Sequence, residues 1–390
     1  MIRTTSIPAT LRRLAVAWLG TMALLHGTGC AGQGNTYFDA TRPHHTRDGF
    51  KNNYTDLVDK PFGDLLRWRW EAMRDALPKA PAQPTPVQAP DLVAIHANAA
   101  AGAGMRPAIT WIGHATMLVQ AGGLNVLTDP IFSERASPVQ FIGPQRTQPP
   151  GVAMKDLPPI DVVLITHNHY DHLDCDSVLA LNQRAAGATV FLVPLGLKPW
   201  LKRLGISNAI ELDWWDKAML GRDATGRLTR VVDGERALSV AFYLTPVQHW
   251  SARGFSDRRK TLWGGWAVFS ADFHWYYSGD TGYSPDFADT ARHFAAQNAG
   301  GFDLALLPIG AYAPRWFMKE QHVNPAEAVQ IHRDLGAKRS VGVHWGTFNL
   351  TDESLDQPVI DLAAALRDAS VTDADFFLMR IGETRRLPPR

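Results

Sequence analysis

The chain has 390 residues, of which 45% are hydrophobic and 20% are charged, so its composition is that of a globular protein with a large core. Its 39 Lys and Arg residues against 38 Asp and Glu residues leave a formal net charge of +1. This balance provides no overall basic surface for the phosphate backbone of nucleic acid, and we therefore expect no nucleic-acid partner.

The first 30 residues have the layout of an export signal. Three arginines precede an apolar stretch at residues 14–25, and small residues stand directly before Cys30. The apolar stretch is shorter than the roughly 20 residues that a transmembrane helix needs. The segment resembles a bacterial lipoprotein signal, with Gly27 at the position where such signals usually carry leucine. We therefore expect a protein exported to the periplasm or outer membrane of a bacterium and held at the membrane surface by lipid on Cys30.

Residues 31–105 are expected to form an N-terminal extension that ends in a linker. A helix is predicted over residues 62–74, and the repeated prolines of residues 78–90 favour an extended course and block a helix. Beyond about residue 106 the chain changes to short apolar runs broken by Gly, Asp and Pro. This pattern predicts one domain over residues 106–390, with many strands and a few interposed helices.

Several strands predicted in this domain end at a side chain that can bind a metal. Asp129, His167, His249, Asp280 and His344 each follow such a strand directly or after a short turn. Ligand-type side chains that recur at strand ends favour a single site at one edge of a layered α/β protein. The predicted strands are residues 108–111, 116–121, 125–128, 162–166, 189–193, 239–244, 266–270, 275–278, 304–308 and 340–343.

Two helices are predicted between these strands, at residues 176–184 and 324–335. The second helix has a strong start signal, with Asn324 as the cap, a proline at the first helical position and Glu327 three residues after the cap. This start places His322 just before a helix N-terminus, where free backbone N–H groups favour an anionic ligand.

The densest group of ligand-type residues lies directly after the apolar run at residues 162–165. His167, His169, Asp171 and His172 fall within six positions. Such a group would repel as it protonates and would leave polar atoms without partners, unless a positive ion offsets the crowding. Imidazoles and carboxylates favour Zn²⁺, while manganese or iron stays open. Cys175, three residues further on, is expected to be a small buried residue and no ligand.

This cluster, followed by His249, by Asp280 in Ser-Gly-Asp-Thr-Gly and by His344 in Gly-Val-His-Trp, resembles the metallo-β-lactamase superfamily from about residue 106 to the C-terminus. The resemblance implies a four-layer αββα sandwich and two metal ions bridged by Asp280, whose two oxygens allow one for each ion. Two cations about 4 Å apart would share a water and lower its pKa toward about 7, which makes a bridging hydroxide available. The implied ligands are His167, His169 and His249 for one ion and Asp171, His172 and His344 for the other.

Four further segments, at residues 111–116, 212–215, 309–318 and 321–325, resemble bacterial relatives of the N-acyl-phosphatidylethanolamine-hydrolysing phospholipase D. The resemblance implies hydrolysis of a phosphodiester in that phospholipid or a similar amphiphile. A lactone or ester hydrolase of the same fold remains an alternative, because a di-metal centre serves those reactions too. A lipoprotein that binds metal without turnover is the alternative from another class.

Several residues are expected to act on the substrate. Asp171 is expected to be catalytic as a metal ligand, and His322 by binding a phosphoryl oxygen or protonating the leaving alkoxide. His114 is expected to contact the substrate or to brace the metal ligands from behind. Arg315 would pair with a phosphate or make a surface salt bridge. Trp316 and Met318 would line an acyl groove or belong to the core.

Overall fold

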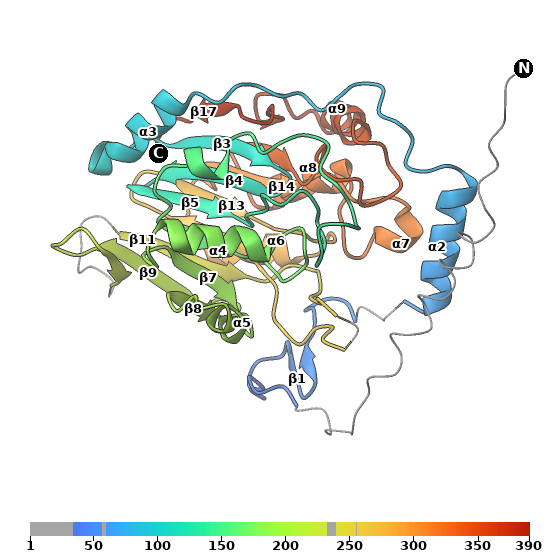
Figure 1. Cartoon of the computed structure of the whole chain (residues 1–390), viewed down its shortest axis with the longest axis horizontal. Helices are drawn as coiled ribbons and strands as arrows, with labels where there is room; N and C mark the ends of the chain where they lie inside the picture. Colours follow the sequence, from blue (N-terminus) through green and yellow to red (C-terminus); the bar gives the residue numbers. More distant parts are fainter. Residues whose placement is uncertain (1–33, 57–59, 232–238, 255) are drawn as a thin grey trace, which may run out of the picture.

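The computed structural model describes residues 34–56, 60–231, 239–254 and 256–390 (Figure 1). The expected signal segment and Cys30 lie outside the described residues. Among the helices of the described ranges, none is both long and apolar enough to cross a membrane.

The described strands form two large sheets and one two-stranded sheet. The seven-stranded sheet has the order β17 (Thr384–Arg386), β3 (Ala108–Gly113), β4 (Thr116–Ala121), β5 (Leu124–Thr128), β6 (Val162–Leu164), β7 (Val190–Pro194) and β8 (Ala209–Leu212). The eight-stranded sheet has the order β10 (Leu228–Arg230), β9 (Lys217–Arg222), β11 (Ser239–Thr245), β12 (Gly265–Phe269), β13 (His274–Tyr277), β14 (Leu304–Pro308), β15 (Ser340–Val343) and β16 (Phe376–Phe377). The small sheet pairs β1 (His45–Thr46) with β2 (Gly49–Phe50).

The two large sheets pack face to face, and helices cover their outer faces (Figure 1). Alternation along β6 shows the layering, because Val162 and Leu164 belong to the core between the sheets while Val163 packs outward against helices. Both faces of the strand are buried, which explains its unbroken apolar sequence. The αββα order that the family resemblance implied is confirmed. The outer helices are α3 (Leu92–Ala100), α4 (Cys175–Arg184) and α5 (Lys198–Arg203) on one side, and α6 (Asp286–His293), α8 (Pro325–Asp334) and α9 (Gln357–Ala369) on the other.

The predicted strands agree with the observed ones to within one or two residues at their ends. The strand predicted to run to residue 166 ends earlier, at Leu164, because the backbone N–H of Thr166 turns to donate to Asp129 Oδ1 at 2.8 Å. The predicted cap of α8 is confirmed: Asn324 Oδ1 accepts from the Glu327 N–H at 2.9 Å, and Glu327 Oε2 accepts from the Asn324 N–H at 3.0 Å.

The N-terminal extension packs against the sandwich at several places. The carboxylate of Asp213, which follows β8, accepts hydrogen bonds from His44 Nε2 at 2.6 Å and His45 Nε2 at 3.0 Å. The proline-rich stretch contains no helix, as predicted, and forms a parallel bridge between Val87 and Ile381. The predicted helix α2 (Phe62–Arg74) stands beside α7 (Arg315–Met318) at one side of the molecule (Figure 1). Short 3₁₀ turns occur at Gly102–Gly104 and Met154–Asp156.

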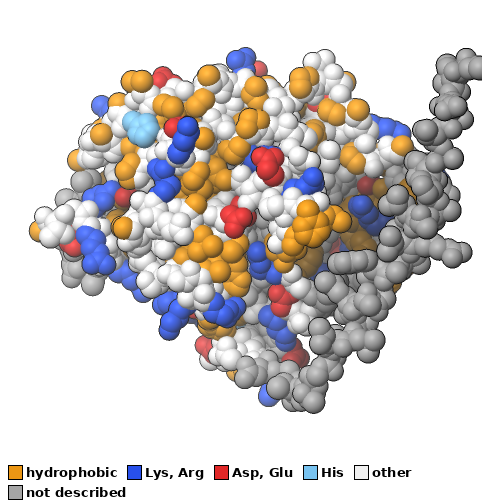
Figure 2. All heavy atoms as spheres, in the orientation of Figure 1, with side chains coloured by type: hydrophobic (Ala, Val, Ile, Leu, Met, Phe, Trp, Pro, Cys, Tyr) orange, Lys and Arg blue, Asp and Glu red, His pale blue; other side chains and the backbone are white. Residues whose placement is uncertain are grey.

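The surface in Figure 2 carries charges of both signs. On the described part of this face, Lys and Arg side chains alternate with Asp and Glu and with apolar side chains. This distribution agrees with the net charge of +1 and shows no continuous basic stripe on the face in view.

Candidate metal centre

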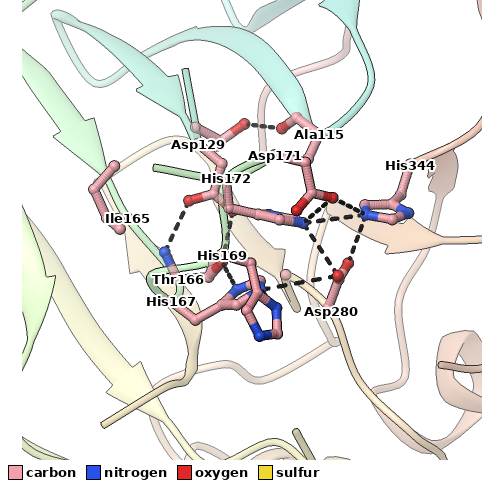
Figure 3. A network of polar contacts seen from close by, with 12 residues as sticks. Ala115, Asp129, Ile165, Thr166, His167, His169, Asp171, His172, Asp280 and His344 are labelled. Carbon is pink, nitrogen blue, oxygen red and sulfur yellow. Dashed lines mark hydrogen bonds and ion pairs between the residues drawn. The ribbon is translucent and has the colours of Figure 1, made fainter. Parts of the chain in front are cut away.

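The predicted ligands come from strand ends that meet at one edge of the sandwich. His167, His169, Asp171 and His172 lie on the loop after β6, Asp280 follows β13 and His344 follows β15 (Figure 3). His249 lies in the loop between β11 and β12. The parallel pairing of β13, β14 and β15 brings their carboxyl ends to the same edge. Residues up to 177 positions apart in sequence therefore share one site.

Three imidazoles form the first cluster of ligand atoms. His167 Nε2 lies 2.8 Å from His169 Nδ1, and His249 Nε2 lies 3.3 Å from the same His169 nitrogen. All three side chains are buried or half-buried. The convergence of three ring nitrogens suits one tetrahedral metal ion with its fourth position open.

The second cluster combines two imidazoles with a carboxylate. His344 Nε2 lies 3.1 Å from His172 Nε2 and 3.2 Å from Asp171 Oδ2. His114 belongs to the same group of ligand-type atoms, with its Nε2 3.0 Å from the same Asp171 Oδ2. Two imidazole nitrogens that face each other at this distance need a shared proton or a cation between them.

Asp280 lies between the clusters (Figure 3). Its Oδ2 atom is 3.1 Å from His172 Nε2, 3.9 Å from His167 Nε2 and 4.0 Å from His249 Nε2. Its Oδ1 atom is 3.1 Å from His344 Nε2. One carboxylate therefore reaches the ligand atoms of both clusters. The adjacent Gly279 makes this approach possible, because a Cβ there would lie 2.6 Å from the Thr166 side chain and its φ is +60°.

Hydrogen bonds behind the rings fix which nitrogen faces the centre. The hydroxyl of Thr166 donates to Asp129 at 2.6 Å and so accepts from His167 Nδ1 at 3.0 Å. Asp129 Oδ2 also accepts from His172 Nδ1 at 2.8 Å. Each of these Nδ1 atoms therefore carries the proton, and the Nε2 lone pair points at the centre.

The three imidazoles of the first cluster and the Asp280 carboxylate are already in the protonation states that metal ligands need. Burial lowers the pKa of His169 to about 4 and lowers the pKa values of His167 and His249 well below 6.5, so these imidazoles are neutral at pH 7. Burial alone would raise the pKa of Asp280, but His172 and His344 outweigh it and hold that pKa well below 3.8. The bridging carboxylate is therefore ionised.

The residues present fit a pair of metal ions. His322 Nδ1, which lies 3.8 Å from Asp280 Oδ2, is buried and has no hydrogen-bond partner among the described residues, which is costly unless an ion, water or substrate occupies the centre. The donor set of imidazole nitrogens and carboxylate oxygens is the one that zinc and similar divalent ions take. The ligand role of each predicted residue stays a prediction, and the geometry brings all seven together.

The centre opens into a cavity of about 500 Å³. His169, Asp171 and Asp280 form its floor, and His322 lies at its wall. Its apolar lining includes Leu65, Trp68, Ala311, Phe317, Met318 and Leu350, and its cations are Lys60 and Arg258.

His322 lies where the sequence predicted it, directly before α8 and beside the centre. Its Nδ1 atom is 3.8 Å from Asp280 Oδ2. Burial lowers the pKa of His322 to about 4, so the imidazole is neutral at pH 7 and carries a single N–H. His114 is buried, contacts the Asp171 carboxylate and is not among the described residues that line the cavity, so its role as a brace stays a prediction.

The structure corrects the substrate contact expected for Arg315. Its Nη2 donates to Glu327 Oε2 at 2.7 Å, and its Nη1 donates to the His322 carbonyl at 2.7 Å. The negative charge of Glu327, a residue that also takes part in the cap of α8, attracts the guanidinium. Trp316 is likewise 42% exposed and lies under Arg67, outside the described cavity lining, while Met318 lines the cavity.

Replacing Arg315 with alanine is expected to lower the free energy of unfolding by about 1–2 kcal/mol, because a half-buried charged hydrogen bond is lost. The KM for the substrate is expected to stay within about threefold of wild type. Thermal unfolding and steady-state kinetics of Arg315→Ala and Arg315→Lys check this. A tenfold or larger rise in KM with unchanged stability would instead restore the substrate contact.

Metal binding is expected to release protons from the second cluster. Burial alone would lower the pKa of His344, but Asp280 and Asp171 outweigh it and raise the pKa to about 9 in the metal-free protein. The same two carboxylates hold the pKa of His172 well above 6.5. A metal ion must displace these protons. Since fewer protons compete as the pH rises toward 9, the apparent metal affinity is expected to increase up to about pH 9 and then level off.

Calorimetric titration with zinc in buffers of different ionisation enthalpy measures this release. We expect about one to two protons per chain at neutral pH. An affinity that falls with rising pH, or binding without proton release, would contradict the charge assignment.

Some residues of the site could not be found from sequence patterns. Trp68 and Lys60 belong to the extension, yet both line the cavity. Trp68 stacks on Phe317 with ring centroids 4.8 Å apart and donates to Asp352 at 2.9 Å. The apolar face of α2 predicted a packed helix and gave no indication of the element against which it packs.

Comparison with known proteins places these observations in a family. The family described as "Beta-lactamase superfamily domain" matches residues 124–345, more than half of the chain. The chain is 40% identical over 282 residues to N-acyl-phosphatidylethanolamine-hydrolyzing phospholipase D 1 of Caenorhabditis elegans, a stretch that covers 70% of this chain and 74% of that protein. It is 39% identical over 312 residues to an uncharacterized protein of Mycobacterium tuberculosis, covering 78% of this chain and 74% of the relative.

A mitochondrial N-acyl-phosphatidylethanolamine-hydrolyzing phospholipase D of Saccharomyces cerevisiae is 34% identical over 257 residues, covering 64% of this chain and 49% of that protein. Among solved structures, a possible metal-dependent hydrolase from Veillonella parvula aligns with a TM-score of 0.54 at 17% identity, over 72% of this chain and 100% of that one. An isothiocyanate hydrolase from Delia radicum gut bacteria aligns with a TM-score of 0.53 at 20% identity, over 72% and 99%. These two structures show the shared fold. The chain therefore belongs to the metallo-β-lactamase superfamily and is a metal-dependent hydrolase of that fold.

Proposed function

We propose that this hydrolase cleaves the phosphodiester bond of a phospholipid, with N-acyl-phosphatidylethanolamine or a similar amphiphile as substrate. The observation that carries the proposal is the cavity, in which apolar walls lead directly to the ligand cluster. Phe317 and Met318 come from α7, and Trp68 faces them from α2. Such walls suit acyl chains, while the ligand cluster suits the phosphate.

The cations of the cavity support an anionic substrate. Lys60 Nζ lies 4.3 Å from the centroid of the Phe317 ring, and the Arg258 guanidinium lies 3.8 Å from the centroid of the Trp250 ring. Both residues line the cavity that contains Asp280 and His322. Their positive charge favours a phosphate diester over a neutral lactone of similar size. The two phospholipase D relatives point to the same class of substrate.

We further propose that the centre holds two Zn²⁺ ions, one at His167, His169 and His249 and one at Asp171, His172 and His344. When bound, such ions activate water as a nucleophile and stabilise negative charge that develops on oxygen. Asp280 would contribute to the binding of both ions, since its Oδ2 lies 3.9 Å from His167 Nε2 and its Oδ1 lies 3.1 Å from His344 Nε2. The neutral imidazole of His322 donates its N–H to a phosphoryl oxygen, while the apolar walls keep bulk water from the acyl chains.

A matched substrate panel tests this function. The full chain, loaded with zinc, would be offered N-acyl-phosphatidylethanolamine and phosphatidylethanolamine in mixed micelles, alongside lactones and simple carboxylic esters, with products read by mass spectrometry. We expect phosphatidic acid from both phospholipids, together with N-acylethanolamine from the N-acylated lipid and ethanolamine from phosphatidylethanolamine. His169→Ala serves as the control for activity that depends on the centre.

The other outcomes identify the alternatives. Hydrolysis of lactones or esters without hydrolysis of phospholipids would show that the protein is a lactone or ester hydrolase of the same fold. Stoichiometric metal with no turnover of any substrate would favour a metal-binding lipoprotein. Either result would overturn the phosphodiesterase proposal.

We also propose export and lipid attachment at Cys30, which would place the enzyme and its substrate at one membrane surface. The mass of the mature protein, purified from the membrane fraction of its own bacterium, tests this. We expect cleavage before Cys30 and an added acylated glycerol. A full-length unmodified N-terminus would overturn it.

A further inference from the structure

The N-terminal extension reaches the loop that carries His249. The Phe50 N–H donates to the Arg259 carbonyl at 2.9 Å, and Phe50 is buried in the core between the sheets. Asn53 Nδ2 donates to Asp286 Oδ1 at 2.8 Å. The segment between these two anchors lies outside the residues matched to the family, 124–345. It nevertheless contacts a predicted metal ligand directly.

Asn52 makes this contact with both ends of its side-chain amide. Its Nδ2 donates to the His249 carbonyl at 3.0 Å, and its Oδ1 accepts from the His249 N–H at 3.0 Å. Asn52 is only 4% exposed, so neither bond competes with bulk water. The amide therefore pairs with the backbone of His249 as a neighbouring strand would, across 197 positions of sequence.

The orientation of this amide is determined by Trp263. Its indole Nε1, which can only donate, lies 3.1 Å from Asn52 Oδ1 and 3.0 Å from the Val247 carbonyl. The atom of Asn52 that faces Trp263 must therefore be the oxygen, and Nδ2 must face the His249 carbonyl.

The ring of His249 is held from its other side. His249 Nδ1 donates to the Gln321 carbonyl at 3.0 Å, which leaves the Nε2 lone pair facing His169 Nδ1. Backbone and ring are thus fixed independently, the backbone by Asn52 and the ring by Gln321. Because both the backbone and the ring of His249 are already fixed, the residue does not have to become ordered when it binds an ion. Loss of either set of hydrogen bonds should therefore weaken metal binding.

We propose that Asn52 is a positioning residue of the metal centre, which holds His249 in place for the ion bound with His167 and His169. The inference rests on the proposed two-ion centre and makes the extension part of that centre. It assigns no contact between Asn52 and the substrate.

Zinc affinity of the full chain, measured by competition with a chromophoric chelator, tests the assignment independently of any substrate. Asn52→Ala is expected to weaken one of the two binding steps by about 10- to 100-fold and to leave the other unchanged. Anomalous diffraction from zinc-loaded crystals is expected to show reduced occupancy beside His249 and full occupancy beside His344. Asn53→Ala is the matched control, since it removes a tether of the same segment without touching His249, and both steps should remain at wild-type affinity.

Wild-type affinity at both steps in folded Asn52→Ala protein would overturn the proposal, as would equal weakening in Asn53→Ala. If Asn52→Ala does not fold, Trp263→Phe takes its place, because it removes the N–H that orients the amide. A weakening of about threefold or more at the same step is then expected, and unchanged affinity would overturn the proposal. Failure of the phospholipid assay leaves these metal titrations unaffected, so the two proposals fail separately.

Discussion

Asp280→Ala is expected to lower kcat/KM by more than about 10³-fold and to reduce the metal content below two ions per chain. The reason is geometric, because the Asp280 carboxylate reaches both clusters: its Oδ2 lies 3.9 Å from His167 Nε2 in the first, and its Oδ1 lies 3.1 Å from His344 Nε2 in the second. Without the Asp280 carboxylate, no negative charge would stand between the two metal ions to offset their repulsion. Metal analysis and steady-state kinetics on the purified variant measure both effects.

Asp280→Asn and Asp286→Asn separate charge from packing. Asp280→Asn keeps the shape of the side chain but removes its charge, so we expect it to lose nearly as much activity as the alanine variant. Asp286 is equally buried and lies outside the site, bonded to Ser284 and Asn53. Its asparagine variant is expected to keep two ions and full turnover. An active Asp280→Asn enzyme with both ions retained would show that the bridging role is wrong.

His322→Ala is expected to lower kcat by about 10²- to 10³-fold while both ions remain bound. His322 lines the cavity and lies 3.8 Å from Asp280, but it belongs to neither ligand cluster. Its neutral imidazole has a buried nitrogen without a partner, which a phosphoryl oxygen or an ordered water would satisfy. Because the interaction strengthens as charge develops on that oxygen, the loss should appear mainly in kcat.

His322→Gln tests the nature of this contact. The amide keeps an N–H donor of similar reach, so the variant is expected to recover part of the activity lost in His322→Ala. Metal content is measured in parallel for both variants. Loss of an ion in His322→Ala would identify His322 as a ligand, and unchanged kcat with both ions present would identify it as a packing residue only.

The histidine cluster could be predicted from the sequence because four ligand-type residues fall within six positions after an apolar strand. The strands gave the same kind of local signal, since β6 and β14 are unbroken apolar runs, whereas the αββα order came from the family resemblance. The start of α8 was equally clear, because Asn324 and Glu327 form their capping bonds within one turn.

Other elements depend on contacts between distant residues. Strand β17 is polar, with the sequence Thr-Arg-Arg, and becomes a strand only by pairing with β3 at the sheet edge. Asp280 lies in a glycine-rich turn, and only the family resemblance distinguished it from an ordinary turn residue. Asn52 carries no local signal at all, because its partner His249 lies 197 positions away. Arg315 allowed two interpretations, and the position of Glu327 decides between them.

Cys175 shows the limit of an argument from residue type. A free cysteine was expected to be buried, but it is the first residue of α4 and is partly exposed. Its position three residues after His172 does not bring it into either ligand cluster among the described residues.

Anomalous diffraction at the zinc edge, from crystals of the full chain loaded with zinc, tests the two-ion centre most directly. Two peaks are expected on either side of the Asp280 carboxylate, one among His167, His169 and His249 and the other among Asp171, His172 and His344. A single peak, or metal bound elsewhere while these seven side chains remain unoccupied, would contradict the centre on which the proposed hydrolysis depends.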